Sequence, residues 1–303
     1  MALQGSGAIS FANLQSEFGG GHPITMSEYY GRASGIPTSG QISMNQFHGK
    51  SNIQYVSISM GTHFVLTSQS AFSNLNSSNP IHVTLTGNAI ASNSGNWAFQ
   101  TGNITGYNHV TLVINGSIKG YRGTGGGGRN NAAGYSGGAG GRAMSIQSST
   151  GTSNLTIDNN SQIYGGGGGG GGGGGFRILN DRTTSTYCAT SNKWGCTSWA
   201  TTCTNSSSYS YASGGNGGTG YGSTGSQAGG GGGASLSRTH CSGGVSGTAG
   251  SGGTGGGAGA AGNGGGSSTW GGGAGGSRGI AIQRNGSNIS WSGGYGSYAG
   301  TIS

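Results

Sequence analysis

The sequence predicts a mostly β and irregular chain: a short-helix module, a small β-layer, and a stacked glycine-rich domain. Glycine supplies 76 of the 303 residues, whereas average proteins hold about 7%. Only 30% of the chain is apolar and 5% is charged, which excludes one large packed core. Glycine density also changes along the chain, with 9 glycines in residues 1–50, 5 in 51–115 and 62 in 116–303.

The composition argues against several classes of protein. Only four acidic residues occur, so a carboxylate-based hydrolase is disfavoured and we expect no enzyme. The formal net charge is +8, but the cations are scattered singly, and we expect no nucleic-acid partner. Glycine lacks the strict spacing of collagen, and only three prolines are present. The start lacks a signal-peptide pattern, and no stretch of 18 apolar residues predicts membrane insertion.

The first fifty residues are predicted to form a module of short helices. The expected helices are 10–19, 27–31 and 43–49, each of which starts at a capping Ser and ends at a Gly. Segment 7–14 is similar to 40–47, so the module contains a short repeat. Because it has few large apolar residues, we expect it to complete its core against a partner.

Residues 51–115 are predicted to form a small β-layer or β-sandwich. Polar and apolar side chains alternate over 55–60, and 63–67 and 81–86 are further short β runs. Asn, Ser, Pro and Gly bound these runs, as at the ends of strands.

Residues 116–303 are predicted to stack as repeats. Segment 137–147 resembles 272–283. Segments 110–118, 155–163 and 280–289 are each expected to form a strand, a tight turn and another strand that leads into glycine. Their Asn-Gly pairs suit type I′ turns.

The glycine runs are expected to form a bundle of extended helices of the polyproline-II type. An isolated run of eleven glycines, such as 165–175, would be disordered, because fixing each residue costs roughly 1–2 kcal/mol. Side by side, chains without Cβ atoms can approach closely and bond N–H to C=O. A flexible Gly/Ser linker is the alternative. The candidate runs are 123–128, 137–141, 165–175, 214–220, 229–233, 252–266 and 271–276.

An aromatic and basic insertion, 176–213, interrupts the glycine-rich part and is the main candidate binding segment. Trp, Tyr and Arg anchor interfaces, and Trp and Tyr also stack on sugar rings. The same rings could equally form a satellite core that pins the loop.

Four cysteines, Cys188, Cys196, Cys203 and Cys241, are disulfide candidates with three possible connectivities. Zinc is disfavoured by their spacing, although His240 adjoins Cys241, and free thiols are the remaining alternative. We therefore expect no metal and no cofactor. None of the six histidines falls in a nucleophile motif, so no catalytic residue is predicted.

Three segments, 5–15, 23–30 and 39–49, resemble a module common in tail and fibre proteins of tailed phages. The glycine-rich half is similar to the receptor-binding adhesin at the long-tail-fibre tip of T-even-like phages. That resemblance implies stacked polyglycine-II helices with variable host-recognition loops between them. The insertion with its Cys and Trp residues departs from the family, so only the role of the loops is carried over.

The resemblance predicts a virion protein of the tail or fibre tip, made in the host cytoplasm and acting outside the cell. Its partners would be other tail or fibre proteins and a bacterial glycan or outer-membrane protein, and a homotrimer is one option. Residues 1–50 would dock to the virion, residues 51–115 would form a β-rich support domain, and residues 116–303 would carry the recognition loops. The alternatives are a purely structural tail, fibre or decoration subunit and an ice-binding protein. The predicted receptor-binding residues are Arg182, Tyr187, Lys193, Trp194, Trp199, Tyr209, Tyr211, Tyr221, Arg238, His240 and Trp270. The predicted virion-docking residues are Phe11, Leu14, Phe18, Tyr29, Tyr30 and Phe47.

Overall fold

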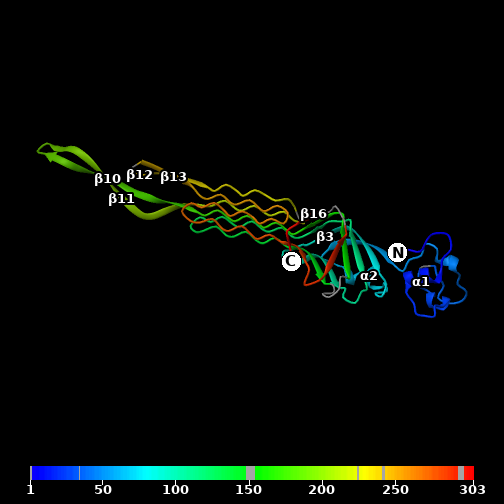
Figure 1. Cartoon of the computed structure of the whole chain (residues 1–303). Helices are drawn as coiled ribbons and strands as arrows, with labels where there is room; N and C mark the ends of the chain where they lie inside the picture. The colour runs from blue at the N-terminus through cyan, green and yellow to red at the C-terminus, as the bar shows by residue number, and fades with distance from the viewer. Residues whose placement is uncertain (1, 34, 148–153, 224, 241–242, 293–296) are drawn as a thin grey trace.

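The computed structural model is an elongated molecule with four parts along its long axis (Figure 1). An N-terminal module is followed by a β-unit, then by a bundle of extended glycine segments, and a long β-hairpin forms the far end. The structure describes residues 2–33, 35–147, 154–223, 225–240, 243–292 and 297–303. For residues 181–184, 203–207, 239–240 and 243–245 it describes the backbone alone.

The N-terminal module contains helix α1 (Phe11–Phe18) and two 3₁₀ turns, η1 (Met26–Tyr29) and η2 (Met44–Phe47). Ser10 caps α1 as predicted: the Asn13 backbone N–H donates to Ser10 Oγ at 3.2 Å. Gly19 ends this helix with a φ of 73°, in the left-handed region. The second expected helix is a single turn capped at Thr25 rather than Ser27, and the third is a single turn that starts after Ser43.

The module has a hydrophobic core of its own, and its completion by a partner stays a prediction. The rings of Phe18, Tyr29 and Phe47 meet edge to face, with centroids 5.8–6.3 Å apart. Leu3, Leu14 and Ile36 are buried around them. Three clustered rings let a segment this short bury enough apolar surface to pack.

The β-unit is a parallel solenoid of five coils built from two facing sheets. One sheet contains, in order, β1 (Gln54–Thr62), β3 (Ile81–Ile90), β5 (Val110–Ile114) with β6 (Ile118–Lys119), β8 (Leu155–Asn159) with β9 (Gln162–Tyr164), and β15 (Ile289–Ser292) with β16 (Ser297–Ala299). The other contains β2 (Phe64–Val65), β4 (Trp97–Asn103), β7 (Arg142–Gln147), β14 (Ile280–Gln283) and β17 (Thr301–Ile302). The chain alternates between the sheets and adds each strand beside the preceding one. Turn η3 (Leu66–Ser68) and helix α2 (Ser70–Ser73) connect β2 to β3.

Side chains at equivalent positions of successive coils stack and form the main core. Val83 pairs with Leu112, and Leu112 pairs with Ile157, in the first sheet. Met144 and Ile282 pair in the second, so the predicted repeat of 137–147 in 272–283 is confirmed. These side chains are fully buried. The solenoid therefore takes part of its third coil and all of its fourth and fifth coils from sequence beyond 51–115, and its strands are parallel rather than arranged as an ordinary sandwich.

The two Asn-Gly pairs behave differently. Asn285 and Gly286 have φ values of 49° and 75°, and the Ser287 N–H donates to the Arg284 carbonyl at 2.7 Å, which confirms a type I′ turn. Asn115-Gly116 is instead a kink between β5 and β6, which continue in the same direction in one sheet, so the turn prediction there is wrong.

The glycine bundle consists of eight extended runs. Runs 1 to 8 are 120–129, 134–141, 165–175, 213–222, 227–234, 249–257, 260–266 and 271–279. Runs 1 and 2 are an excursion from the third solenoid coil, and runs 3 to 8 are an excursion from the fourth. The predicted single run 252–266 is in fact two, because the chain reverses near Gly259, whose φ is 59°.

Run 3 is the axis of the bundle and has six runs around it. The N–H groups of Gly169, Gly170 and Gly171 donate to runs 2, 4 and 7, at 2.8, 2.8 and 2.9 Å. Their carbonyl oxygens accept from runs 8, 1 and 6, at 2.7, 2.8 and 2.8 Å. The pattern repeats every three residues, the period of the polyproline-II helix, and all of 165–175 is buried. The predicted cross-bonded bundle is therefore confirmed.

Candidate recognition surface

Four connections between runs meet at the bundle end that lies away from the β-unit (Figure 1). Odd-numbered runs lead away from the β-unit and even-numbered runs return, so every odd-to-even connection falls at this end. The connections are 130–133, the hairpin of β10 (Phe176–Asn192) and β11 (Gly195–Ala212), the hairpin of β12 (Ser235–His240) and β13 (Gly243–Thr248), and 267–270.

An aromatic cluster holds the base of the β10–β11 hairpin against connection 267–270. The Arg177 guanidinium lies 4.5 Å from the centroid of Tyr209 and 5.4 Å from that of Trp270. Tyr211 stacks on Trp270, with centroids 6.1 Å apart and an interplanar angle of 26°. The Arg177 backbone N–H also donates to Thr269 Oγ1 at 3.1 Å. These contacts orient the hairpin relative to the bundle.

A second set of contacts joins this hairpin to the β12–β13 hairpin. Arg238 donates from Nε and Nη2 to Ser210 Oγ, at 3.3 and 3.1 Å, and Ser210 Oγ donates to Asn180 Oδ1 at 2.6 Å. The Phe176 ring covers Gly247, where an added Cβ would lie 2.1 Å from a ring carbon. These contacts therefore hold the bases of the two hairpins against each other.

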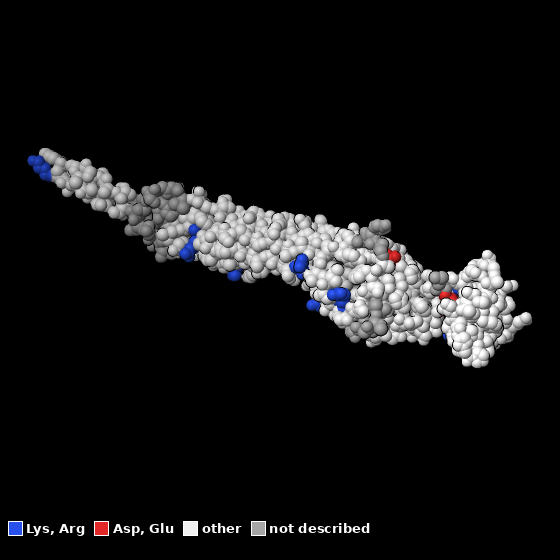
Figure 2. Space-filling model, viewed as in Figure 1, with Lys and Arg blue, Asp and Glu red and all other residues white. Residues whose placement is uncertain are grey.

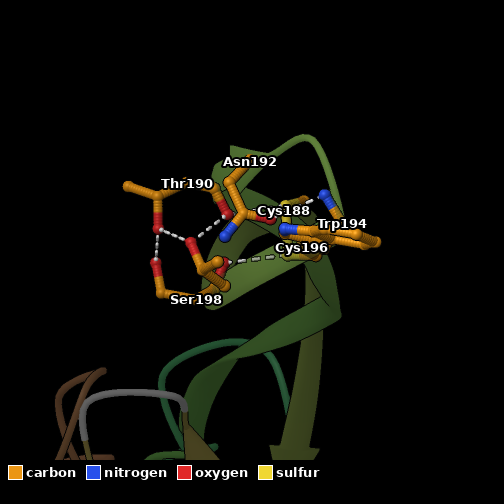
Figure 3. The surroundings of a disulfide bond; sticks show 7 residues. Cys188, Thr190, Asn192, Trp194, Cys196 and Ser198 are labelled. Carbon is orange, nitrogen blue, oxygen red and sulfur yellow. Dashed lines mark hydrogen bonds between the residues drawn. A yellow bond between two sulfur atoms is a disulfide. The ribbon is translucent and has the colours of Figure 1, made fainter.

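A disulfide closes the far end of the β10–β11 hairpin. Cys188 and Cys196 are bonded, with Cα atoms 5.6 Å apart, across the turn at 193–194. Figure 3 shows the Trp194 side chain on the same side of the turn as the disulfide, and the Trp194 N–H donates to Asn192 Oδ1 at 2.9 Å. The prediction of a disulfide is confirmed for this pair. The side chain of Cys203 and all of Cys241 lie outside the described residues.

The aromatic side chains near the turn are exposed to solvent. Exposure is 85% for Trp194, 68% for Trp199 and 49% for Tyr187. The Lys193 ammonium lies 5.5 Å from the Trp194 ring centroid. Figure 2 shows basic side-chain atoms at this extreme end of the molecule. These rings form no satellite core, whereas Tyr209 and Tyr211 pack near Trp270 and pin the base of the loop. The satellite-core interpretation therefore applies to the base of the insertion, and the binding interpretation of its exposed rings stays a prediction.

The predicted recognition residues do not all lie at this end. Tyr221 lies at the opposite end of run 4, where its ring meets Tyr164 edge to face at 6.2 Å. The side chains of Arg182 and His240 lie outside the described residues. The structure places Arg177, which was not among the predicted binding residues, in the aromatic cluster at the hairpin base. Its position two residues after the long glycine run, with Tyr209 and Tyr211 near the end of the same insertion, was the available signal.

Most of the predicted virion-docking residues are interior. Leu14, Phe18, Tyr29 and Phe47 are buried within the module, whereas Phe11 is 40% exposed and Tyr30 is half-buried. Burial raises the pKa of the Tyr29 phenol, and the nearby Glu28 carboxylate raises it further. Near α1, residues Ala2, Leu3, Gln4, Asn13, Ser16 and Glu17 line a surface hollow.

The described part of the chain offers neither a metal site nor a membrane helix. No group of three or more His, Cys, Asp or Glu among the described residues could hold a metal ion. No described helix is long and apolar enough to cross a bilayer.

Comparison with known proteins gives a family. The model of the phage tail fibre adhesin Gp38 family matches residues 51–303. A crystal structure of the gp37–gp38 adhesin tip complex of the bacteriophage S16 long tail fibre is similar, with 18% sequence identity and a TM-score of 0.43, covering 96% of this chain and 92% of that one. The search of curated proteins found no match. Because the family match covers most of the sequence, the chain belongs to the Gp38 family of phage tail fibre adhesins.

Proposed function

We propose that this chain is the terminal adhesin of a phage tail fibre, which holds the particle through residues 1–50 and a bacterial surface molecule through the loops at the bundle end. The observation that carries this proposal is the separation of the two ends: the module and the four connections lie at opposite ends of the molecule (Figure 1). The protein would act by binding and not by catalysis.

The bundle suits this role because it is a rigid spacer. Run 3 alone shares hydrogen bonds with six neighbours, so the connections start from fixed positions. Loops that are already ordered lose less conformational entropy on binding. Arg177, Tyr211 and Trp270 extend this order into the base of the long hairpin.

The attachment end would use the exposed part of the N-terminal module. Phe11 and Tyr30 are the predicted docking residues that reach the surface there. Glu17 fastens the module to the following segment, since it accepts from Ser51 Oγ at 2.9 Å and from the Asn52 N–H at 3.2 Å. The partner would be another tail or fibre protein.

The test is adsorption of phage that carry Trp194→Ala together with Trp199→Ala. We expect adsorption to fall at least tenfold, because exposed Trp residues anchor interfaces. Tyr55→Ala is the control, since Tyr55 is a 69% exposed aromatic residue of the solenoid. Unchanged adsorption of the double variant would favour the alternative, a structural subunit without its own receptor.

A further inference from the structure

The outer part of the β10–β11 hairpin is a free-standing ribbon. We define the distal arm as residues 183–204, in which Thr183 pairs with Thr204 and the strands end at the turn. The arm projects beyond β12 and β13 (Figure 1). Nine residues separate Thr183 from Asn192, so it is about 30 Å long at about 3.3 Å per residue.

The arm is uniformly polar apart from three rings. It contains no Leu, Ile, Val, Met or Phe, and its single charged residue is Lys193 in the turn. Trp199 pairs with Cys188, and Tyr187 pairs with Ala200, so the two rings lie on opposite faces of the ribbon. Neither face is an apolar surface that could lie flat on a partner.

From this shape we infer that the distal arm inserts into a recess of a folded receptor protein, with Trp194 and Lys193 leading. The inference rests on the proposed function and adds the mode of binding, in which the partner supplies a recess and the arm fills it. Long, narrow loops that project from a rigid scaffold bind concave sites in the same way.

The contact area supports insertion. A stable interface needs about 800 Å² from each partner. The turn alone offers about 300 Å², if the ribbon is about 10 Å wide and 10 Å thick. Burial of the sides to a depth of about 20 Å would supply the required area.

The chemistry of the arm also suits enclosure. Burying a charge without a partner is costly, and the sides of the arm carry none. Their hydroxyl groups can exchange hydrogen bonds with a polar wall, as Thr190 Oγ1 already does with Ser198 Oγ and Thr197 Oγ1, at 2.5 and 2.9 Å. The disulfide holds the leading turn in one shape before contact.

The test places a charge on the side of the arm. Ala189 is an exposed residue of a bulge, about 10 Å behind the turn, so Ala189→Glu should leave the free protein folded. Ala139→Glu, on exposed run 2, is the matched control. The measurement is binding of the full-length protein to cells that the phage infects, with the disulfide and thermal unfolding checked for each variant.

We expect Ala189→Glu to weaken binding at least tenfold and Ala139→Glu to leave it unchanged. Removing the paired residues 185–186 and 201–202 shortens the arm without altering the turn, and should also weaken binding at least tenfold. If both arm variants bind normally while Trp194→Ala does not, contact is confined to the turn and insertion is refuted. If Trp194→Ala with Trp199→Ala also binds normally, the proposed function itself fails.

A second treatment identifies the class of receptor. Proteinase digestion of the cells should abolish binding, and periodate oxidation of their saccharides should not. The reverse result would assign a saccharide receptor and overturn the inference, while leaving the adhesin function intact.

Discussion

The clearest prediction concerns Gly170, in the middle of the axial run. A Cβ on this residue would lie 2.0 Å from the Gly253 carbonyl oxygen and 2.8 Å from the Thr254 carbonyl oxygen, both on run 6. Run 6 would have to move away by at least about 1 Å to restore normal contact. Gly170→Ala should therefore separate runs 3 and 6.

The cost follows from the hydrogen bonds between these runs. Run 6 donates from Gly250, Gly253 and Gly256 to the axial run, at 2.9, 2.8 and 2.8 Å. Each buried group left without a partner costs about 1–3 kcal/mol, so the three bonds amount to about 3–9 kcal/mol. The smaller backbone entropy of unfolded alanine offsets about 0.4–1 kcal/mol. We expect a net loss of about 2–9 kcal/mol, a large part of the 5–15 kcal/mol typical of a folded protein.

Gly232→Ala is the matched control. Gly232 is exposed on run 5, and an added Cβ would have no atom within 4 Å. We expect this change to be neutral or to stabilise by up to about 1 kcal/mol. Thermal unfolding by calorimetry should show a decrease of at least roughly 4 °C for Gly170→Ala. If both variants unfold within about 1 °C of the parent protein, which is less than the shift expected for 1 kcal/mol, the close-packed axis does not exist.

The other predictions concern the two ends. Tyr29→Phe should stabilise the N-terminal module by about 1 kcal/mol in denaturant titrations, because the buried hydroxyl has no hydrogen-bond partner among the residues that the structure describes. The raised pKa of Tyr29 favours the neutral phenol in the folded state, so the parent should lose stability as pH rises above about 10, and the Phe variant should lose less. Cys188→Ser with Cys196→Ser should reduce the free energy that keeps the turn ordered by about 2–3 kcal/mol. Proteases should then cleave the turn faster, while thermal unfolding of the bundle stays unchanged. Cleavage at the parent rate would contradict this prediction. Trp270→Ala removes the ring that lies against Arg177 and should therefore speed amide hydrogen exchange at the hairpin base. Unchanged exchange would show that the aromatic cluster does not order the hairpin base.

Local features of the fold were predictable wherever neighbouring residues decide them. Ser10 and Gly19 mark the ends of α1 because a cap acts on its own helix. Alternation identified strands near 55–60 and 81–86. The composition of 176–213 marked the long hairpin as a separate element, although not which of its rings pin the base and which are free.

The errors arose where the outcome depends on distant residues. Asn115-Gly116 has the sequence of a tight turn, but both N–H groups donate to the Leu85 carbonyl of a neighbouring strand, at 2.9 and 3.2 Å. Run 252–266 contains its own reversal near Gly259, where alanines at 258, 260 and 261 interrupt the glycine, but residues this small do not by themselves specify a turn. Four cysteines allow three connectivities, and only the folding of β10 against β11 brings Cys188 to Cys196, although their register partners are Trp199 and Ser191.

The sequence by itself determined that glycine segments would lie side by side, because segments without side chains can be ordered only by bonding to one another. It also determined that aromatic and hydroxyl-rich loops would interrupt them. The tertiary structure alone decided which run is central and at which end the loops emerge. The reason is that all glycine runs are chemically alike, so their places depend on the solenoid coils from which they leave and to which they return.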